Sequence, residues 1–191
     1  MKREKKYGKP PCRLKIKITG EEFLILVKKF EYRGDWSEVF YLYFDTDDCQ
    51  NKADLYSQQF RLRVRERKGE YSLELKKYKG EKHVEMSQRI SDEEFRLLFQ
   101  GLVPNGEIRR NISFLQRPVR CIGLANTVRK KIHFHHGILV LDQTHCNAHT
   151  YYGIEFRSDE AVSPEIIQEI QSQLNVPMRE YQLKIEGLWG T

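Results

Sequence analysis

The chain has 191 residues, of which 39% are hydrophobic and 31% are charged. This length is typical of one domain, and its ten phenylalanines and ten tyrosines exclude a disordered chain, which would lack the aromatic side chains of a packed core. The longest apolar runs, such as 138–141, are too short to cross a bilayer, so we expect no membrane partner. The formal net charge of +6 favours anionic partners: nucleic acid, phosphate esters or an acidic membrane surface.

The first ten residues and the cysteines bear on where the domain begins and on its cellular location. Residues 1–10 are basic and are not followed by an apolar segment, so we expect a flexible tail and not a secretory signal, ahead of a single domain over 11–191. The cysteines form neither a CxxC pair nor a zinc-type spacing. Free thiols in a reducing cytoplasm are the simplest interpretation of Cys12, Cys49, Cys121 and Cys146.

Three helices have clear start signals. Two are capping boxes, in which Ser or Thr is followed three residues later by Glu. The third is a serine followed by proline at the first helical position. These signals are Thr19 with Glu22, Ser91 with Glu94, and Ser163 with Pro164, and they predict helices over 21–30, 92–100 and 164–174, with a weaker helix over 107–115.

The remaining elements are strands, several of which place basic residues at alternate positions. In 61–67, arginines alternate with Leu62 and Val64, and alternation of this period puts all the arginines on one face. An ordinary sheet with a solvated polar face explains any one such strand. Several strands whose alternate residues are nearly all Arg or Lys gather like charges that repel, which favours a bound anion. The predicted strands are 13–19, 39–44, 61–67, 72–76, 82–88, 128–132, 137–142 and 151–157.

Three short segments are more specific than this pattern. They read Tyr-Phe-Asp-Thr at 43–46, Leu-Arg-Val-Arg at 62–65 and Leu-Glu-Leu-Lys at 73–76, with a turn at Gly69 between the last two. Their order and spacing resemble the CYTH family, also called triphosphate tunnel metalloenzymes, and most closely its small bacillus-type branch of proposed adenylate cyclases and triphosphatases. Further matches at Glu85, 123–129, 139–142, 152–155 and Lys184 extend the similarity over nearly the whole chain after the tail.

The resemblance implies a mainly β fold, in which eight antiparallel strands close into a barrel, or tunnel, with helices packed outside. In the family, lumenal Arg and Lys hold a triphosphate, while glutamates hold one or two Mg²⁺ or Mn²⁺ ions. Family activities include hydrolysis of inorganic triphosphate, RNA 5′-triphosphate and thiamine triphosphate, and adenylate cyclisation. The anion-binding residues expected here are Lys15, Lys17, Arg63, Arg65, Lys76, Arg129 and Lys184, with Lys131 as an addition.

The chain departs from the family at the metal ligands. The family's first strand contains Glu-x-Glu-x-Lys, whereas residues 11–17 read Pro-Cys-Arg-Leu-Lys-Ile-Lys, with no glutamate in either register, and Gly153 replaces the first glutamate of a later pair. Cations in place of hard carboxylate ligands should repel Mg²⁺. The acids that remain are Glu74, Glu85, Asp142 and Glu155. They either pair with neighbouring Arg and Lys, or form a relocated metal site from Glu85, Asp142 and Glu155.

We therefore expect a tunnel domain that binds triphosphate, a nucleoside triphosphate or another phosphorylated polyanion, with weak or no hydrolysis. One alternative is an active triphosphatase that depends on Mg²⁺ or Mn²⁺; adenylate cyclase activity is less favoured. The other is a nucleic-acid-binding protein, which is disfavoured because the alternation hides the basic residues inside a barrel. The sequence assigns no catalytic residue and no oligomeric state.

Two other polar features have structural interpretations. Asp45, in the Tyr-Phe-Asp-Thr segment, is expected to support a strand end and not to act in catalysis. His133, His135 and His136 flank a predicted hairpin turn without an acidic or cysteine partner nearby in sequence, so a solvated turn is expected there and not a metal site.

Overall fold

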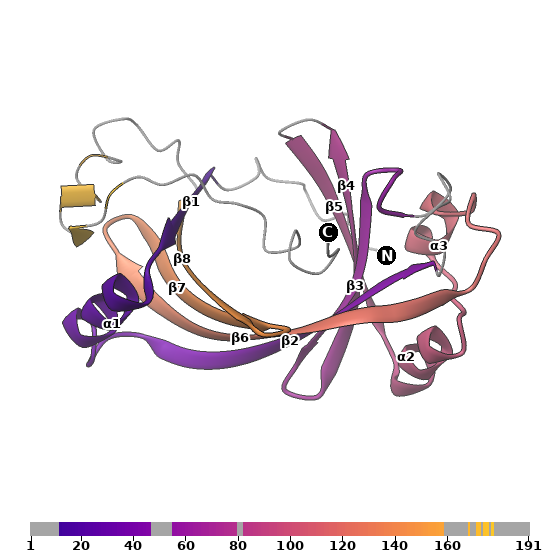
Figure 1. The fold of residues 1–191 in the computed structure, drawn as a ribbon, viewed down its shortest axis with the longest axis horizontal. Coiled ribbons are helices and arrows are strands. Elements are labelled where there is room, and N and C mark those ends of the chain that lie inside the picture. Colours follow the sequence, from indigo (N-terminus) through magenta and orange to yellow (C-terminus); the bar gives the residue numbers. More distant parts are fainter. Residues whose placement is uncertain are drawn as a thin grey trace, which may run out of the picture. The chain divides into compact units, whose positions relative to one another are not determined.

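The computed structural model describes residues 12–46, 55–79, 82–158, 168, 171–172, 174–175 and 177. This part of the chain is mainly β, as predicted (Figure 1). Its elements are β1 (Cys12–Ile18), α1 (Gly20–Lys29), β2 (Asp35–Thr46), β3 (Phe60–Arg67), β4 (Glu70–Lys79), β5 (Lys82–Ile90), α2 (Asp92–Phe99), α3 (Glu107–Asn111), β6 (Val119–Phe134), β7 (Gly137–Cys146) and β8 (His149–Ser158). None of the described helices combines the length and apolarity that crossing a bilayer requires.

The eight strands form one antiparallel sheet in the order β1-β8-β7-β6-β2-β3-β4-β5. The sequence predicts a closed barrel, but within the described ranges β1 and β5 stand at opposite ends of this order and are not hydrogen-bonded neighbours. These two edge strands belong to different compact units of the chain. The predicted mainly β fold class is confirmed, whereas closure of the sheet between β1 and β5 is not observed among the residues that the structure describes.

The two compact units divide the sheet between them. In the described part of the chain, unit 1 contains residues 12–37, 128–144, 150–158, 168, 171–172, 174–175 and 177. Unit 2 contains 38–46, 55–79, 82–127 and 145–149. Both β2 and β6 contribute residues to each unit, and β6 is much longer than the predicted strand, with 16 residues.

The core of unit 1 lies between α1 and the apolar side of its strands. The predicted capping box starts α1, because the Thr19 hydroxyl accepts from the Glu22 amide at 3.2 Å and the Glu22 carboxylate accepts from the Thr19 amide at 2.7 Å. Phe23 and Leu26 of α1 then pack in one cluster with residues of β1, β6, β7 and β8. The helix predicted over 164–174 lies mostly outside the described residues. Residues 168, 171, 172 and 174 of it are helical, and Leu174 is buried in this core.

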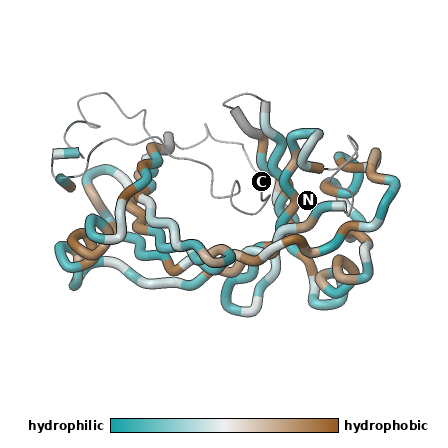
Figure 2. Tube along the Cα trace, in the orientation of Figure 1, coloured by the Kyte–Doolittle hydropathy of each residue, from teal (hydrophilic) through white to brown (hydrophobic). Residues whose placement is uncertain are grey.

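The core of unit 2 contains the inward residues of β3 and β4. Leu62 and Val64 of β3 are fully buried with residues of β4, and Leu98 of α2 and Ile108 of α3 belong to the same cluster. Both helices lie beside these strands in Figure 1. Hydropathy alternates along the strands, as the teal and brown segments of Figure 2 show. The capping box predicted for α2, Ser91 with Glu94, is present, whereas α3 ends at Asn111 and is shorter than predicted.

Asp45 connects the end of β2 to the turn at residues 55–59. Its buried carboxylate accepts from the backbone amides of Thr46 at 2.7 Å, Leu55 at 2.8 Å and Tyr56 at 3.1 Å. The structural role expected for Asp45 is therefore observed. The three histidines are exposed around the turn between β6 and β7, as expected for a solvated turn, and His135 there adopts a φ of 49°.

Asp45→Ala should lower the free energy of unfolding by about 2–4 kcal/mol, because buried backbone amides lose their acceptor. Urea denaturation measures this change. The control is Asp35→Ala, at an exposed aspartate at the start of β2, with an expected effect within about 0.5 kcal/mol. Equal effects of the two substitutions would contradict the role given to Asp45.

Candidate functional site

Unit 2 gathers basic residues on the side of β3 that faces away from its core. Arg61, Arg63 and Arg65 alternate with the buried Leu62 and Val64. In the antiparallel register, Arg61 lies opposite Lys76, Arg63 opposite Glu74, and Lys76 in turn opposite Glu85 of β5. We call this group the unit 2 basic face; it comprises Tyr41, Tyr43, Arg61, Arg63, Arg65, Glu74, Lys76, Tyr78 and Glu85.

Two carboxylates hold three of these cations together. Glu74, only 3% exposed, accepts from Arg63 Nε at 2.7 Å and pairs with Arg65 Nε at 3.2 Å. Glu85 lies 3.7 Å from Arg63 Nη2 and 3.5 Å from Lys76 Nζ. These five groups therefore have an excess of positive charge. Arg63 and Lys76 are largely shielded from solvent, which strengthens their attraction for an anion.

Two tyrosines of β2 surround Arg63. Its guanidinium carbon lies 4.3 Å from the centroid of the Tyr41 ring, a cation–π distance. Burial raises the pKa of Tyr43, although the charge of Arg63 and its hydrogen bond to Tyr43 oppose this change. Burial acts to lower the pKa of Arg63, but Glu74 and the two tyrosines outweigh it, so the net shift is upward. Arg63 is thus a fixed cation with a fixed orientation.

Unit 1 has its own group, the unit 1 basic face, on the side of its sheet opposite the core. Arg129 of β6 donates a fork of two hydrogen bonds to Asp142 of β7, from Nε at 2.6 Å and Nη2 at 2.7 Å. Such bidentate pairs are among the stronger side-chain interactions. On β8, Arg157 Nη2 donates to Glu155 Oε2 at 2.6 Å. The face comprises Lys15, Lys17, Arg129, Lys131, Asp142, Glu155 and Arg157, with Lys15 opposite Glu155 in the β1–β8 register.

The pKa of Glu155 is shifted by the charges around it. Burial acts to raise the pKa of its carboxyl, but the hydrogen bond from Arg157 and the charges of Lys15, Arg157 and Arg129 more than offset that effect, so the pKa lies below its ordinary value of 4.5. The carboxylate is therefore ionised at neutral pH. The positive charges of Arg157, Lys15 and Arg129 stabilise this ionised form.

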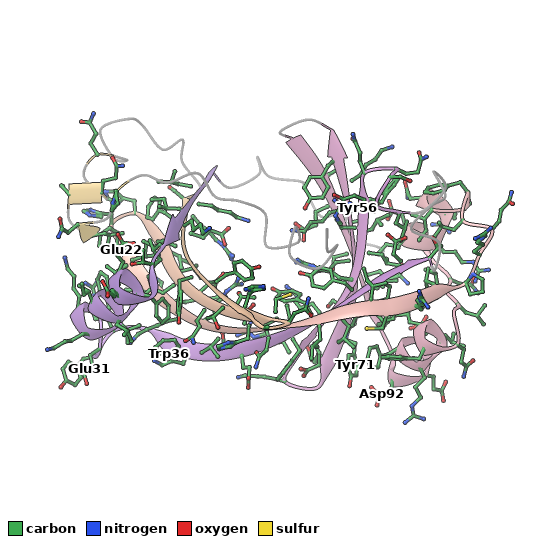
Figure 3. The ribbon with its side chains drawn as sticks, in the orientation of Figure 1. Glu22, Glu31, Trp36, Tyr56, Tyr71 and Asp92 are labelled. Carbon is green, nitrogen blue, oxygen red and sulfur yellow. The ribbon has the colours of Figure 1, made fainter. Side chains whose placement is uncertain are left out.

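Lys130 shows that not every basic residue of β6 belongs to the basic face. It alternates with Arg129 and points to the opposite side of the strand, where it is 2% exposed. Its Nζ donates to the Glu31 carbonyl at 3.1 Å and lies 5.2 Å from the Trp36 ring centroid; Glu31 and Trp36 are labelled in Figure 3. Lys130 therefore has a structural role in holding the segment between α1 and β2.

The acids of the two faces do not match the ligand set of a Mg²⁺ or Mn²⁺ site. Each of Glu74, Glu85, Asp142 and Glu155 pairs with an Arg or Lys of its own unit. No three His, Cys, Asp or Glu side chains within the described ranges are grouped so that they could hold a metal ion. In the described part of β1, residues 12–17 read Cys-Arg-Leu-Lys-Ile-Lys and supply no carboxylate, the ligand type that hard cations need.

The structure distributes the predicted site residues between the units. Lys15, Lys17 and Arg129 lie in unit 1 with Asp142 and Glu155, whereas Arg63, Arg65, Lys76 and Glu85 lie in unit 2. Lys184 lies outside the described residues. Four members of the basic faces were not among the predicted anion-binding residues: Tyr41, Tyr43, Arg61 and Arg157. Alternation did place Arg61 on the arginine face of its strand, and the same period along β2 and β8 could have identified the other three.

Glu155→Gln should make the free energy of unfolding decrease less as the pH is lowered. A carboxyl with a depressed folded pKa contributes stability that is fully present above its unfolded pKa, near 4.5, and is lost as the pH falls through the folded value. Urea denaturation from roughly pH 7 to pH 3 should therefore show a shallower decline for the variant than for the native chain. Glu31→Gln, at an exposed glutamate, is the matched control. A decline as steep as that of the native chain would contradict this assignment.

Comparison with known proteins gives one family match and several similar folds. The CYTH domain matches residues 14–184. A proposed adenylate cyclase from Bacillus halodurans is 26% identical, with a TM-score of 0.76 over 93% of this chain and 96% of that one. A proposed adenylyl cyclase from Hippeastrum, described as having a dominant triphosphatase activity, is 18% identical, with a TM-score of 0.74 over 93% and 94% of the two chains.

A third solved structure, of a Pyrococcus horikoshii protein, is 16% identical, with a TM-score of 0.58 over 93% of this chain and 97% of that one. At this identity, and at that of the Hippeastrum protein, the likeness concerns the fold alone. No curated protein matched the chain. The family match extends from β1 to beyond the last described residue, and the chain therefore belongs to the CYTH family.

Proposed function

We propose that this chain binds a triphosphate, or another phosphorylated polyanion, through its basic faces, and that it hydrolyses the bound anion weakly or not at all. The observation that supports binding most directly is the unit 2 basic face, where Arg63, Arg65 and Lys76 share two carboxylates. A phosphorylated ligand supplies the negative charge that this group lacks. Membership of the CYTH family, in which triphosphates are bound or hydrolysed, agrees with this choice of ligand.

The side chains suit phosphate chemistry. Arginine presents several N–H donors in a planar fork, and lysine presents a compact charge, so together they can replace the hydration of several phosphate oxygens. Arg63 is fixed by Glu74 and Tyr41, whereas the Arg65 side chain is 43% exposed and has room to turn toward a ligand. A fixed cation beside a more mobile one gives both a preformed contact and an adjustable one.

Weak hydrolysis is proposed because the groups that would act on the phosphate chain are already engaged. Phosphoryl transfer depends largely on positioning and charge neutralisation, with a metal ion bridging phosphate oxygens. Here the first strand supplies no glutamate, since residues 11–17 read Pro-Cys-Arg-Leu-Lys-Ile-Lys, and the remaining acids pair with Arg or Lys. We also propose a reducing cytoplasm as the location, supported by the free thiols of Cys121 and Cys146.

The alternative function is metal-dependent triphosphate hydrolysis through Glu85, Asp142 and Glu155. Family membership favours it, because CYTH proteins typically depend on divalent metal ions. It requires Mg²⁺ or Mn²⁺ to displace the Arg and Lys partners of these carboxylates. General nucleic-acid binding is less well supported, since Arg63 and Lys76 are largely shielded from solvent and do not form an exposed stripe.

Inorganic triphosphate should raise the melting temperature of the native chain, with or without a chelator. At a ligand concentration of about 100 times Kd, the stabilisation is about 2.7 kcal/mol.

Lys76→Gln should weaken triphosphate binding about tenfold, since it removes one largely buried cation from the face. Calorimetric titration measures Kd, with Arg96→Ala on the exposed surface of α2 as a control that leaves Kd unchanged.

Phosphate release, followed in the same samples with Mg²⁺, Mn²⁺ or neither, separates the functions. Binding without release supports the proposal. Metal-dependent turnover abolished by Glu85→Gln or Asp142→Asn would establish the alternative, and no stabilisation by triphosphate at all would overturn both.

A further inference from the structure

One end of the unit 2 basic face contains an aromatic stack. The guanidinium carbon of Arg61 lies 4.0 Å from the centroid of the Tyr56 ring and 5.6 Å from that of the Tyr78 ring. The shorter distance places Arg61 directly over Tyr56, and both distances are within cation–π range. Burial raises the pKa of the Tyr78 hydroxyl despite the opposing charges of Arg61 and Arg63. The charges of both arginines therefore act on this hydroxyl, as expected for a side chain on the basic face.

The stack is held in place by the backbone around it. Asp45 accepts from the Tyr56 amide at 3.1 Å, so the turn that presents Tyr56 is fixed to the end of β2. Arg61 Nη1 donates to the Phe60 carbonyl at 2.8 Å, and the Tyr78 amide donates to the Gln59 carbonyl at 2.9 Å. The backbone that presents the two tyrosines and the guanidinium of Arg61 are therefore held before a ligand binds, which lowers the ordering cost of binding.

Tyr56, which lies against Arg61 at the end of this face, is also more accessible than the two tyrosines that β2 contributes to the face. It is 42% exposed, whereas Tyr41 and Tyr43 are buried. Figure 3 labels Tyr56 beside the strands of unit 2. A ring that is fixed, backed by a guanidinium and still open to solvent has the character of a stacking platform, which accepts a flat aromatic ligand with little regard to its hydrogen-bonding pattern.

The phosphate-binding cations are close to this platform. Arg63 is two residues from Arg61 on the same face of β3, a separation of about 7 Å. Lys76 lies directly opposite Arg61 in the β3–β4 register. One ligand with an aromatic ring at one end and phosphate groups at the other can therefore contact Tyr56 and the cations together.

We propose that Tyr56, supported by Arg61 and Tyr78, forms a stacking subsite for the base of a nucleoside triphosphate, so that this chain prefers a base-bearing triphosphate to one without a base. This inference rests on the proposed function, because Arg63 and Lys76 must hold the phosphates. Tyr56 is a specificity-determining residue: its ring contributes to binding only when the ligand has a base.

Calorimetric titration with ATP and with ribose 5-triphosphate tests the subsite, because the two ligands differ only in the base. The native chain should bind ATP about tenfold more tightly, as expected for one stacked base. Tyr56→Leu should remove this preference and leave the Kd for ribose 5-triphosphate unchanged, while Tyr56→Phe should retain it. Tyr32→Leu, which removes an exposed tyrosine of unit 1, is the matched control and should preserve the native ratio of the two Kd values.

The outcomes separate this inference from the proposed function. Equal Kd values for the two ligands in the native chain, or a ratio unaffected by Tyr56→Leu, would overturn the stacking subsite while leaving triphosphate binding intact. Failure of ribose 5-triphosphate and inorganic triphosphate to bind would remove the proposed function itself. If Tyr56→Leu weakens both ligands equally, the residue supports the fold of the turn and the subsite is rejected.

Discussion

Glu74 makes the unit 2 basic face physically possible. Arginines at alternate positions of β3 would repel one another if nothing lay between them. Glu74 enters from β4, opposite Arg63 in the register, and contacts Arg63 and Arg65 at once. One buried carboxylate thereby fixes the guanidinium of Arg63 and also pairs with that of the more exposed Arg65. Because a single negative charge cannot neutralise both, the face keeps its attraction for anions.

The same arrangement affects the chemistry available at the site. A carboxylate that accepts hydrogen bonds from arginine is stabilised in its ionised form, but it is also occupied. Asp142 and Glu155 of unit 1 show this pattern with Arg129 and Arg157. A carboxylate engaged in this way is less available to a metal ion, because ion pairing with arginine and metal binding compete for the same oxygens.

Sequence reasoning succeeded where local rules decide the outcome. The capping boxes of α1 and α2 and the alternation along β3 depend on neighbouring residues, so the helices, the strand and its two faces could be predicted from sequence. The full length of β6 could not, because residues 119–127 owe their strand conformation to partners far away in the chain. Which carboxylate pairs with which cation could not be predicted either. The sharing of Glu74 depends on strand register, and the Arg157–Glu155 contact depends on side-chain conformation.

The position of Glu74 also limits the order in which this sequence can change over time. Loss of Glu74 alone would leave Arg63 and Arg65 side by side without their common partner, whereas loss of one arginine first would leave an ion pair that can persist. Substitutions at the three positions are therefore non-additive, as expected for residues in one network. A lineage that reverts this face toward neutrality is expected to discard an arginine before the glutamate, and one that builds it is expected to acquire the glutamate before the second arginine.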